Sequence, residues 1–485
     1  MRVIRALREL GISSVAVYSE ADRASLHVRM ADEAVYIGPA PAADSYLRID
    51  RILDAATCCG AEAIHPGYGF LSENAQFAAA CETAGIKFIG PPSSSIRAMG
   101  SKTCARKLAT EAGVPVLPGT VNALESLEQA RRAAAEMGYP ILLKASAGGG
   151  GRGMRRVNSE TELESSYRDA SSEAERAFKS GELYIEKLIL KPRHIEIQVL
   201  GDEHGHLIHL GERECSIQRR HQKVIEECPS PLLALHPEMR DRMGAAAVLA
   251  ARSAAYTNAG TVEFLVDAAC NFYFLEMNTR LQVEHPVTEL VTGIDLVHWQ
   301  IRIAAGERLT LKQEDIHWNG AALECRIYAE DPDNQFFPSP GRITHMERPT
   351  GPGIRLDSGV YPGWTVPIDY DPLLSKLAVW ADHREGAIAR MRRALAEYSI
   401  AGIKTNLSFF RDVLTDAAFR SGHLHTGFID EYFERRTGNP EVEGELEQIA
   451  VVIAAFHSAS KLNSVEPAVH SVSKWKTLGR VEQLR

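Results

Sequence analysis

The chain has 485 residues, which corresponds to about two to four domains. Its hydrophobic fraction of 45% and charged fraction of 24% are typical of a folded globular protein and exclude a disordered one. Its 54 basic and 63 acidic residues leave a net charge of −9, and no apolar run approaches the ~18 residues that span a bilayer. We therefore expect a cytoplasmic protein that binds neither nucleic acid nor a membrane.

The first region alternates between helical and strand patterns. Val3, Leu7 and Leu10 recur at helical spacing, and Gly11 ends the run. Strand and helical patterns then alternate at 15–18, 46–59, 63–64, 73–84 and 87–89. This order predicts a parallel α/β domain. Because no strand pattern precedes the first helix, we expect that the chain starts short of a strand of this sheet. A stop codon directly before Met1 would contradict that expectation.

A second α/β texture begins at residue 101. Helical and strand patterns are found at 102–112, 124–137, 140–144, 160–179, 183–189 and 195–200. After Gly320 a further α/β segment runs to about residue 436. The last stretch has one apolar helical run at 446–456, followed by Ser-rich polar sequence.

A glycine cluster follows the strand pattern at 140–144. Lys144 ends that strand, and Gly148–Gly151 are four glycines in a row. Glycine lets the backbone approach a ligand and direct several N–H groups at phosphate oxygens, and Lys144 would add a positive charge. The segment has neither the Gly-Lys-Ser/Thr end of a P-loop nor a Rossmann G-x-G-x-x-G. From these residues alone, a phosphate-binding loop and a flexible turn are both open.

The segment TVEFLVDAACNFYFLEMNTR, residues 261–280, reads as a β-hairpin. If its turn is symmetric, Glu263 lies opposite Glu276, and Asn278 lies opposite Thr261 on the same face. Like charges directly opposite repel, and a divalent cation reverses the sign of that interaction. Two carboxylates and an amide oxygen suit Mg²⁺ or Mn²⁺. The alternative is a solvated surface pair.

Two further segments are rich in polar groups. In NTRLQVEHP, a continued strand would place Asn278, Arg280, Gln282 and Glu284 on one face, as an anion clamp with an adjacent base. The alternative is an exposed strand face. RECSIQRRHQKVIEE, residues 213–227, is dense in charge and fits either a site or a solvated face. The strand HIEIQV before it carries a polar face that would line a site beside a nucleotide.

Together these motifs resemble the biotin carboxylase component of biotin-dependent carboxylases, from residue 1 to about 435. The resemblance is carried by the segments AIHPGYGFLSENA, KASAGGGGRGM, PRHIEIQVLGD, SIQRRHQKVIEE, YFLEMNTRLQVEHPVTE and ECRIYAEDP. It implies an α/β ATP-grasp fold. It also implies an ADP-forming ligase that phosphorylates bicarbonate with ATP and Mg²⁺ or Mn²⁺, and transfers the carboxyl group from carboxyphosphate to biotin.

The resemblance also implies roles for individual residues. Positions that match nucleotide contacts are Lys102, Lys144, Gly150, Gly151, Glu186, Lys187, Leu188, Ile189, His194, Gln218, His221 and Leu265. Positions that match metal ligands are Glu263, Glu276 and Asn278. Positions that match bicarbonate contacts are Lys223, Arg280, Gln282 and Val283. Glu284 matches the base that deprotonates bicarbonate, Arg280 a catalytic arginine, and Arg326 the residue that holds the ureido oxygen of biotin.

The same resemblance suggests how the chain is divided and what it works with. We expect an N-terminal α/β domain at 1–100, an ATP-grasp domain at 101–319 with a lid at about 116–189, a C-terminal domain at 320–436, and a helical and polar tail at 437–485. The tail has no Ala-Met-Lys-Met biotinylation site, so we expect biotin on a separate carrier protein. The implied partners are that carrier and a carboxyltransferase subunit, with the chain itself a homodimer.

The resemblance also suggests a class of final carboxyl acceptor, and two alternative functions are open. We expect the first half-reaction of an acetyl-, propionyl- or methylcrotonyl-type acyl-CoA carboxylase. Another ATP-grasp ligase, such as one resembling carbamoyl-phosphate synthetase, is the first alternative. An inactive scaffold of a carboxylase complex is the second, because the chain lacks the apolar first strand and the Asn-Arg-Gly-Glu turn with which family members begin.

Overall fold

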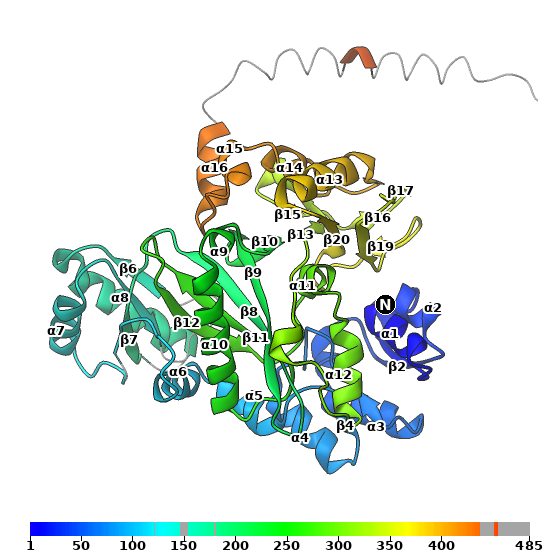
Figure 1. Cartoon of the computed structure of the whole chain (residues 1–485), viewed down its shortest axis with the longest axis horizontal. Coiled ribbons are helices and arrows are strands. Elements are labelled where there is room, and N and C mark those ends of the chain that lie inside the picture. The colour runs from blue at the N-terminus through cyan, green and yellow to red at the C-terminus, as the bar shows by residue number, and fades with distance from the viewer. Residues whose placement is uncertain (121, 146–153, 179–180, 437–450, 454–485) are drawn as a thin grey trace, which may run out of the picture. The chain divides into compact units, whose positions relative to one another are not determined.

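The computed structural model describes residues 1–120, 122–145, 154–178, 181–436 and 451–453 (Figure 1). Met1–Ile429 form one compact unit, and Asp430–Arg485 are assigned to a second. The predicted glycine contacts Gly150 and Gly151, and most of the helical run at 446–456, lie outside the described residues. Across the described ranges, no helix combines the length and apolar character needed to cross a membrane.

The N-terminal region has the predicted parallel α/β character. Its strands form two separate two-stranded parallel sheets, β1 with β2 and β3 with β4. The elements are α1 (Arg2–Glu9), β1 (Val15–Ser19), η1 (Glu20–Asp22), α2 (Leu26–Met30), β2 (Glu33–Gly38), η2 (Ala42–Asp44), α3 (Ile49–Cys58), β3 (Ala63–Ile64), α4 (Ala75–Thr83), β4 (Lys87–Phe88) and α5 (Ser93–Gly100). β2 was not predicted, because most of its side chains are exposed or half-exposed and leave no clear apolar alternation.

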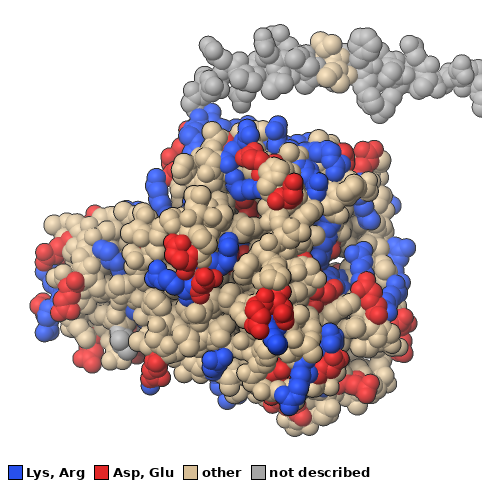
Figure 2. Space-filling model, viewed as in Figure 1, with Lys and Arg blue, Asp and Glu red and all other residues tan. Residues whose placement is uncertain are grey.

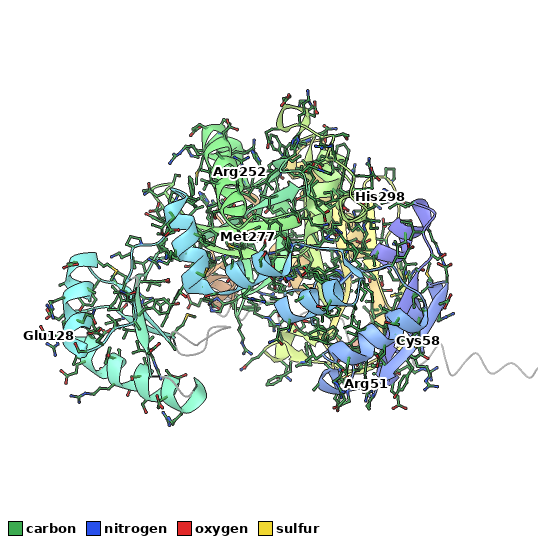
Figure 3. All side chains as sticks on the ribbon, turned by 90° about the horizontal axis from the view of Figure 1, so that it is seen from below. Arg51, Cys58, Glu128, Arg252, Met277 and His298 are labelled. Atoms are coloured by element: carbon green, nitrogen blue, oxygen red, sulfur yellow. The ribbon has the colours of Figure 1, made fainter. Side chains whose placement is uncertain are left out.

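A small lobe follows, built on a three-stranded sheet in the order β6-β5-β7. Its elements, with the helix that precedes it, are α6 (Lys102–Glu111), α7 (Leu127–Met137), β5 (Ile141–Ala145), β6 (Met154–Val157), α8 (Glu160–Phe178) and β7 (Leu183–Lys187). Ile141, Leu143 and Ile185 of the sheet are fully buried with Leu163 of α8 and Ala134 of α7. Figure 3 shows Glu128 on α7, at the outer side of this lobe. The lobe therefore has a hydrophobic core of its own.

An eight-stranded antiparallel sheet holds the centre, in the order β12-β11-β8-β9-β10-β13-β20-β18. Its strands are β8 (Arg193–Gly201), β9 (Leu207–Arg219), β10 (Gln222–Cys228), β11 (Asn258–Val266), β12 (Phe272–Asn278), β13 (Ala321–Tyr328), β18 (Ile354–Ser358) and β20 (Leu373–Ala381). The accompanying helices are α9 (Pro231–Leu235), α10 (Pro237–Ser253), α11 (His285–Thr292), α12 (Leu296–Ala304) and η3 (Gln313–Asp315).

The two faces of this sheet differ because side chains alternate along each strand. Ile197 of β8, Val262 of β11 and Met277 of β12 are buried in one core with α10 and α6, and Figure 3 labels Met277 there. The residues between them, including Glu196 and Glu263, point to the opposite face, on which α11 and α12 pack. The polar residues of the sheet are thus held rigidly by an apolar core behind them.

The C-terminal part continues from this sheet. Its remaining elements are β14 (Glu330–Asp331), η4 (Pro332–Asn334), β15 (Phe337–Pro338), β16 (Gly341–Arg342), β17 (His345–Glu347), β19 (Thr365–Val366), α13 (Arg384–Glu397), β21 (Ser399–Ala401), α14 (Leu407–Val413), α15 (Ala417–Arg420) and α16 (Phe428–Arg436). Figure 2 shows basic and acidic side chains interspersed over the visible face, as the nearly balanced composition suggests.

Candidate functional site

The predicted hairpin is β11 and β12, and its site end has the predicted register. Glu263 pairs with Glu276, and Thr261 pairs with Asn278. The turn end is shifted by one residue, because a bulge follows Glu263 and Phe264 pairs with Phe274. Glu263 is only 5% exposed and Glu276 is half-buried, which argues against a solvated surface pair.

Lys223 of β10 is the centre of the polar face. Its ammonium donates hydrogen bonds to Glu284 Oε1 at 2.8 Å, Glu263 Oε1 at 2.7 Å and Glu196 Oε2 at 2.5 Å. Gln282 Oε1 lies 3.2 Å from the same nitrogen. The three carboxylates come from β8, β11 and the residue before α11, so one ammonium joins segments that are distant in sequence. Although burial disfavours its charge, these carboxylates raise the pKa of Lys223 well above its usual value.

The segment NTRLQVEHP does not continue the strand, and that prediction is wrong. β12 ends at Asn278, a loop and turn follow, and α11 begins at His285. The physical reason is that the backbone finds other partners: Thr279 N–H donates to Glu73 Oε1 at 3.0 Å, and Pro286 favours a helix start. The loop nevertheless brings Gln282 and Glu284 back to the polar face.

The two predicted arginines have different surroundings. Arg280 donates to Glu73 Oε2 and to Asn278 Oδ1, both at 3.0 Å. Arg326 of β13 is buried, and it donates from Nε to Glu226 Oε1 at 2.6 Å and from Nη2 to Glu284 Oε2 at 2.8 Å. Arg326 therefore reaches the opposite side of the same carboxylate that Lys223 holds.

The charge run at 213–227 is for the most part buried. It forms the end of β9, a two-residue turn at Arg220 and His221, and β10. Arg213 is fully buried and donates to Glu196 Oε1 at 2.5 Å, Gln198 Oε1 at 2.7 Å and Thr288 Oγ1 at 3.0 Å. The solvated-face alternative therefore applies only to the turn, where Arg220 and His221 are exposed.

The candidate nucleotide residues lie in two places. In the small lobe, Glu186 of β7 bonds to Lys144 Nζ of β5 and, at 2.9 Å, to Arg106 Nη1 of α6. Lys187 is turned differently, toward the carbonyl oxygens of Gly138 and Tyr139 at 2.9 and 3.2 Å.

The other candidate nucleotide residues lie outside that ion-pair cluster. Leu188 and Ile189 follow β7 and are half-buried, and Lys102 is exposed at the start of α6. On the large sheet, Gln218 Nε2 lies 2.8 Å from His194 Nδ1, and His194 pairs in register with Leu265.

The residues present fit a divalent cation between the hairpin strands. Burial opposes ionisation, yet Lys223 and His194 hold the pKa of Glu263 well below its usual value. Burial and the Glu263 charge raise the pKa of Glu276, against the opposing charge of Lys102. Asn278 completes the set, with its Nδ2 donating to Glu263 Oε1 at 2.9 Å. Glu263 is therefore ionised, and ionisation of Glu276 is disfavoured. A Mg²⁺ or Mn²⁺ ion between them would compensate the negative charge of both carboxylates.

Several residues of the site were not predicted. Glu73, Glu226 and Lys376 contact the predicted residues Arg280, Arg326 and Val283, and Lys376 Nζ donates to the Val283 carbonyl oxygen at 2.6 Å. Arg213 instead holds Glu196, which bonds to Lys223. Glu226 carried no clear signal, because polar and apolar residues do not alternate along QKVIEEC. Glu73 carried none, because its contact with Arg280 depends on the packing of the N-terminal region.

Comparisons with family models cover most of the chain. Residues 1–96 match "Biotin carboxylase, N-terminal domain". Residues 101–312 match "Carbamoyl-phosphate synthase L chain, ATP binding domain". Residues 324–431 match "Biotin carboxylase C-terminal domain".

Individual proteins are similar over nearly their whole length. One of the pyruvate carboxylase subunits of Methanothermobacter thermautotrophicus is 53% identical over 473 residues, 97% of this chain and 95% of that one. Biotin carboxylase 1 of Bacillus subtilis is 52% identical over 433 residues, 89% and 96% of the two chains. A crystal structure of the biotin carboxylase domain dimer of Hydrogenobacter thermophilus 2-oxoglutarate carboxylase, in complex with MgADP, ADP and bicarbonate, has a TM-score of 0.83. It is 52% identical, over 89% of this chain and 94% of that one.

Proposed function

The chain belongs to the biotin carboxylase family, a family of ATP-grasp ligases, and on that premise we propose that it carboxylates biotin held on a separate carrier protein. ATP, Mg²⁺ or Mn²⁺ and bicarbonate are the other reactants and cofactors of this reaction. The observation that carries the proposal is the position of Lys223. Its one ammonium contacts both Glu263 of the candidate metal pair and Gln282 and Glu284 of the candidate bicarbonate residues. Phosphoryl transfer and bicarbonate activation would therefore occur side by side.

In this proposal the protein binds nucleotide between the small lobe and the large sheet. Lys144 and Glu186 of the lobe, with His194 and Gln218 of the sheet, would hold the nucleotide. Glu263, Glu276 and Asn278 would hold the divalent ion, which neutralises phosphate charge when bound. Lys223 and Arg280 add fixed positive charge nearby, and phosphoryl transfer depends on such charge more than on covalent help.

Bicarbonate would lie against Lys223, Arg280, Gln282 and Val283, with Glu284 as its base. Burial opposes ionisation of Glu284, but Lys223, Arg326 and Arg213 hold its pKa far below the usual value. Glu284 is therefore ionised and ready to accept a proton, but only weakly basic. When anionic substrates draw Lys223 and Arg326 toward themselves, Glu284 loses these stabilising partners and becomes a stronger base.

Biotin would be held by Arg326. Its guanidinium cannot lose its charge at neutral pH and would stabilise the negative charge that develops on the ureido oxygen. In this proposal the biotin is held on another polypeptide. The partners in this proposal are the carrier and a carboxyltransferase subunit, with the chain itself in a homodimeric assembly.

Each part of the chain has a place in the proposal. Residues 1–100, 101–319 and 320–436 would be the N-terminal, ATP-grasp and C-terminal domains, with a lid at about 116–189 and a tail from 437. A closing lid would exclude water, to which carboxyphosphate is sensitive.

The final acceptor belongs to the partner subunit. We propose an acyl-CoA of acetyl, propionyl or methylcrotonyl type, because Tyr328 in the motif ECRIYAEDP resembles the residue found in carboxylases of branched or odd-chain acyl-CoA. In this chain Tyr328 is 1% exposed, and its hydroxyl accepts a hydrogen bond from Gln222 Nε2 at 2.9 Å. Relatives named for pyruvate and 2-oxoglutarate carboxylases are as similar as relatives named only biotin carboxylase, so a 2-oxo acid is the competing acceptor. Adding each carboxyltransferase subunit with its substrate distinguishes the two classes.

The experiment that tests the proposal is ADP release by the purified chain with MgATP. We expect turnover that requires bicarbonate and rises when biotin is added. Turnover that requires an amine would instead favour a ligase like carbamoyl-phosphate synthetase, whose ATP-binding domain also matches residues 101–312. A chain that binds MgATP but releases no ADP under any of these conditions would be a scaffold.

A further inference from the structure

Two buried carboxylates face each other beneath α11, outside the residues already assigned. β10 and β13 are antiparallel, and their register places Glu226 directly opposite Glu324. Both side chains are fully buried. Directly opposed residues have Cβ atoms about 4.5–5.5 Å apart, which is close enough for two carboxyl groups to meet. Two ionised carboxylates at that distance in a buried site would repel strongly.

The hydrogen bonds of this pair are incomplete. Glu226 Oε1 accepts a hydrogen bond from Arg326 Nε at 2.6 Å. Throughout the described part of the chain, no group donates a hydrogen bond to Glu226 Oε2 or to either carboxylate oxygen of Glu324. Leaving buried acceptors of this kind unpaired is costly. A proton placed between Glu324 and Glu226 Oε2 satisfies one oxygen of each residue and removes the repulsion.

The neighbouring charged groups do not remove the repulsion between Glu226 and Glu324 in another way. The titratable and charged groups from the packed elements are Cys215 of β9, Lys223 of β10, Cys325 and Arg326 of β13, Lys376 of β20, Glu284 before α11 and His285 of α11. Burial, with Lys376 and Arg355 nearby, keeps His285 neutral by lowering its pKa well below the usual value. Lys223 and Lys376 are engaged with Glu284 and the Val283 carbonyl. Burial raises the pKa of Glu226 to about 7 and that of Glu324 to about 8, against the opposing charges of Arg326 and Lys376.

We propose that Glu226 and Glu324 share one proton, and that this pair is a positioning device for Arg326 in the biotin half-reaction. The proposal rests on the proposed function, in which Arg326 holds the ureido oxygen. Glu226 fixes the guanidinium through Nε and leaves Nη1 and Nη2 for Glu284 and for substrate. With one shared proton the pair carries a single negative charge, which matches Arg326.

Loss of the shared proton changes the environment of Arg326. The pair then carries two negative charges, and the extra charge weakens the positive field of Arg326 at the ureido oxygen. Biotin carboxylation should therefore fall as the pair deprotonates, near pH 8. ATP hydrolysis without biotin depends on the lysines and the metal site, so it should not show this fall.

Glu324→Gln tests the shared proton, because the amide is a permanent hydrogen-bond donor of the same shape. We expect the variant to keep kcat/KM for biotin within about twofold of the wild type at pH 7 and to lose the fall near pH 8. Glu227→Gln is the matched control: Glu227 is the next residue of β10 and pairs with Arg384 instead. The control should keep the wild-type fall. An unchanged alkaline fall in Glu324→Gln would overturn the proposal.

Glu226→Gln tests the positioning role. We expect kcat with biotin to drop at least tenfold, while ADP release without biotin and the KM for ATP change less than twofold. An equal loss of both activities would mean that Glu226 only supports the fold.

Thermal unfolding keeps this inference separable from the proposed function, because it needs no turnover. A carboxyl group whose pKa is raised in the folded state lowers the stability of the protein as pH rises from the pKa of that group in the unfolded chain, about 4.3, through its pKa in the folded state. The Tm of Glu324→Gln minus the Tm of the wild type should therefore become more positive between pH 5 and pH 9, because only the wild type carries the Glu324 carboxyl group. A Tm difference that is constant with pH would contradict the shared proton, whether or not the chain carboxylates biotin.

Discussion

Lys223 shows, at the scale of single residues, how the site holds its charges before substrate arrives. Its ammonium is matched by Glu196, Glu263 and Glu284 and is almost entirely removed from solvent. Such a buried group is stable only while its partners are in place. Substrate anions must therefore displace carboxylates that already accept hydrogen bonds from the Lys223 ammonium.

The metal pair gives the first residue-scale prediction. Glu263→Gln removes one of two opposed carboxylates, and we expect the Mg²⁺ concentration for half-maximal turnover to rise about 10–100-fold. ADP release titrated with Mg²⁺ measures this. Glu314→Gln, an exposed substitution of the same kind, is the control. An unchanged Mg²⁺ dependence would remove the metal assignment.

Arg326 gives the second prediction at the scale of single residues. Arg326→Ala removes the cation assigned to the ureido oxygen, so carboxylation of biotin should fall about 10²–10³-fold. ADP release without biotin should remain within a few-fold of wild type. Both rates are measured in one preparation, and a parallel loss would assign Arg326 to another role.

Residue-level prediction succeeded where a short-range periodicity was sufficient. The Glu263–Glu276 pair follows from period two within one hairpin, and the structure has that register. The Lys223 contacts could not be predicted from periodicity, because they join segments brought together by strand order and by a bulge in β10. The roles carried over by resemblance remain predictions, and Gly150 and Gly151 lie outside the described residues.

At the scale of elements, Arg213 holds the strands and α11 in one arrangement. From β9, Arg213 donates hydrogen bonds to Glu196 on β8, Thr261 on β11 and Thr288 on α11, and all of these residues are fully or almost fully buried. The sequence predicted β8 and the hairpin of β11 and β12, since their alternation is local, but it did not predict β9 and β10 as strands. It did not predict that the charge run would be buried, because burial depends on partners far away in the chain.

We expect Arg213→Met to lower the free energy of unfolding by about 3–5 kcal/mol, because it leaves Glu196 without its guanidinium partner. Urea denaturation measures the change. The double variant Arg213→Met/Glu196→Gln should recover part of the loss, since the stranded charge is then gone. Additive losses in the double variant would argue against a direct coupling.

At the scale of the whole molecule, the proposed reaction uses biotin carried on a second protein. The chain spans 96% of the Bacillus subtilis biotin carboxylase, and the resemblance assigns no biotinyl-lysine to it. The family and the fold were identified from ordered motifs spread over the sequence. The domain boundaries and the class of acceptor remain predictions.

We expect a biotinylated carrier domain added in trans to be carboxylated with a KM at least tenfold below that of free biotin, because protein contacts add to the binding of the ring. Transfer of labelled carboxyl from bicarbonate measures this, with the unbiotinylated carrier as control. A carrier that competes no better than free biotin would mean that the chain recognises the ring alone.

The bulge after Glu263 has a consequence for how this hairpin can vary. β8 pairs with β11 along its whole length and holds Glu263 opposite Glu196, whereas the register of β12 against β11 shifts by one residue between the carboxylates and the turn. The tip at 267–271 is thereby insulated from the carboxylates. We therefore expect that adding or removing one residue at the tip leaves the ion-binding oxygens aligned, whereas the same change at the base misaligns them.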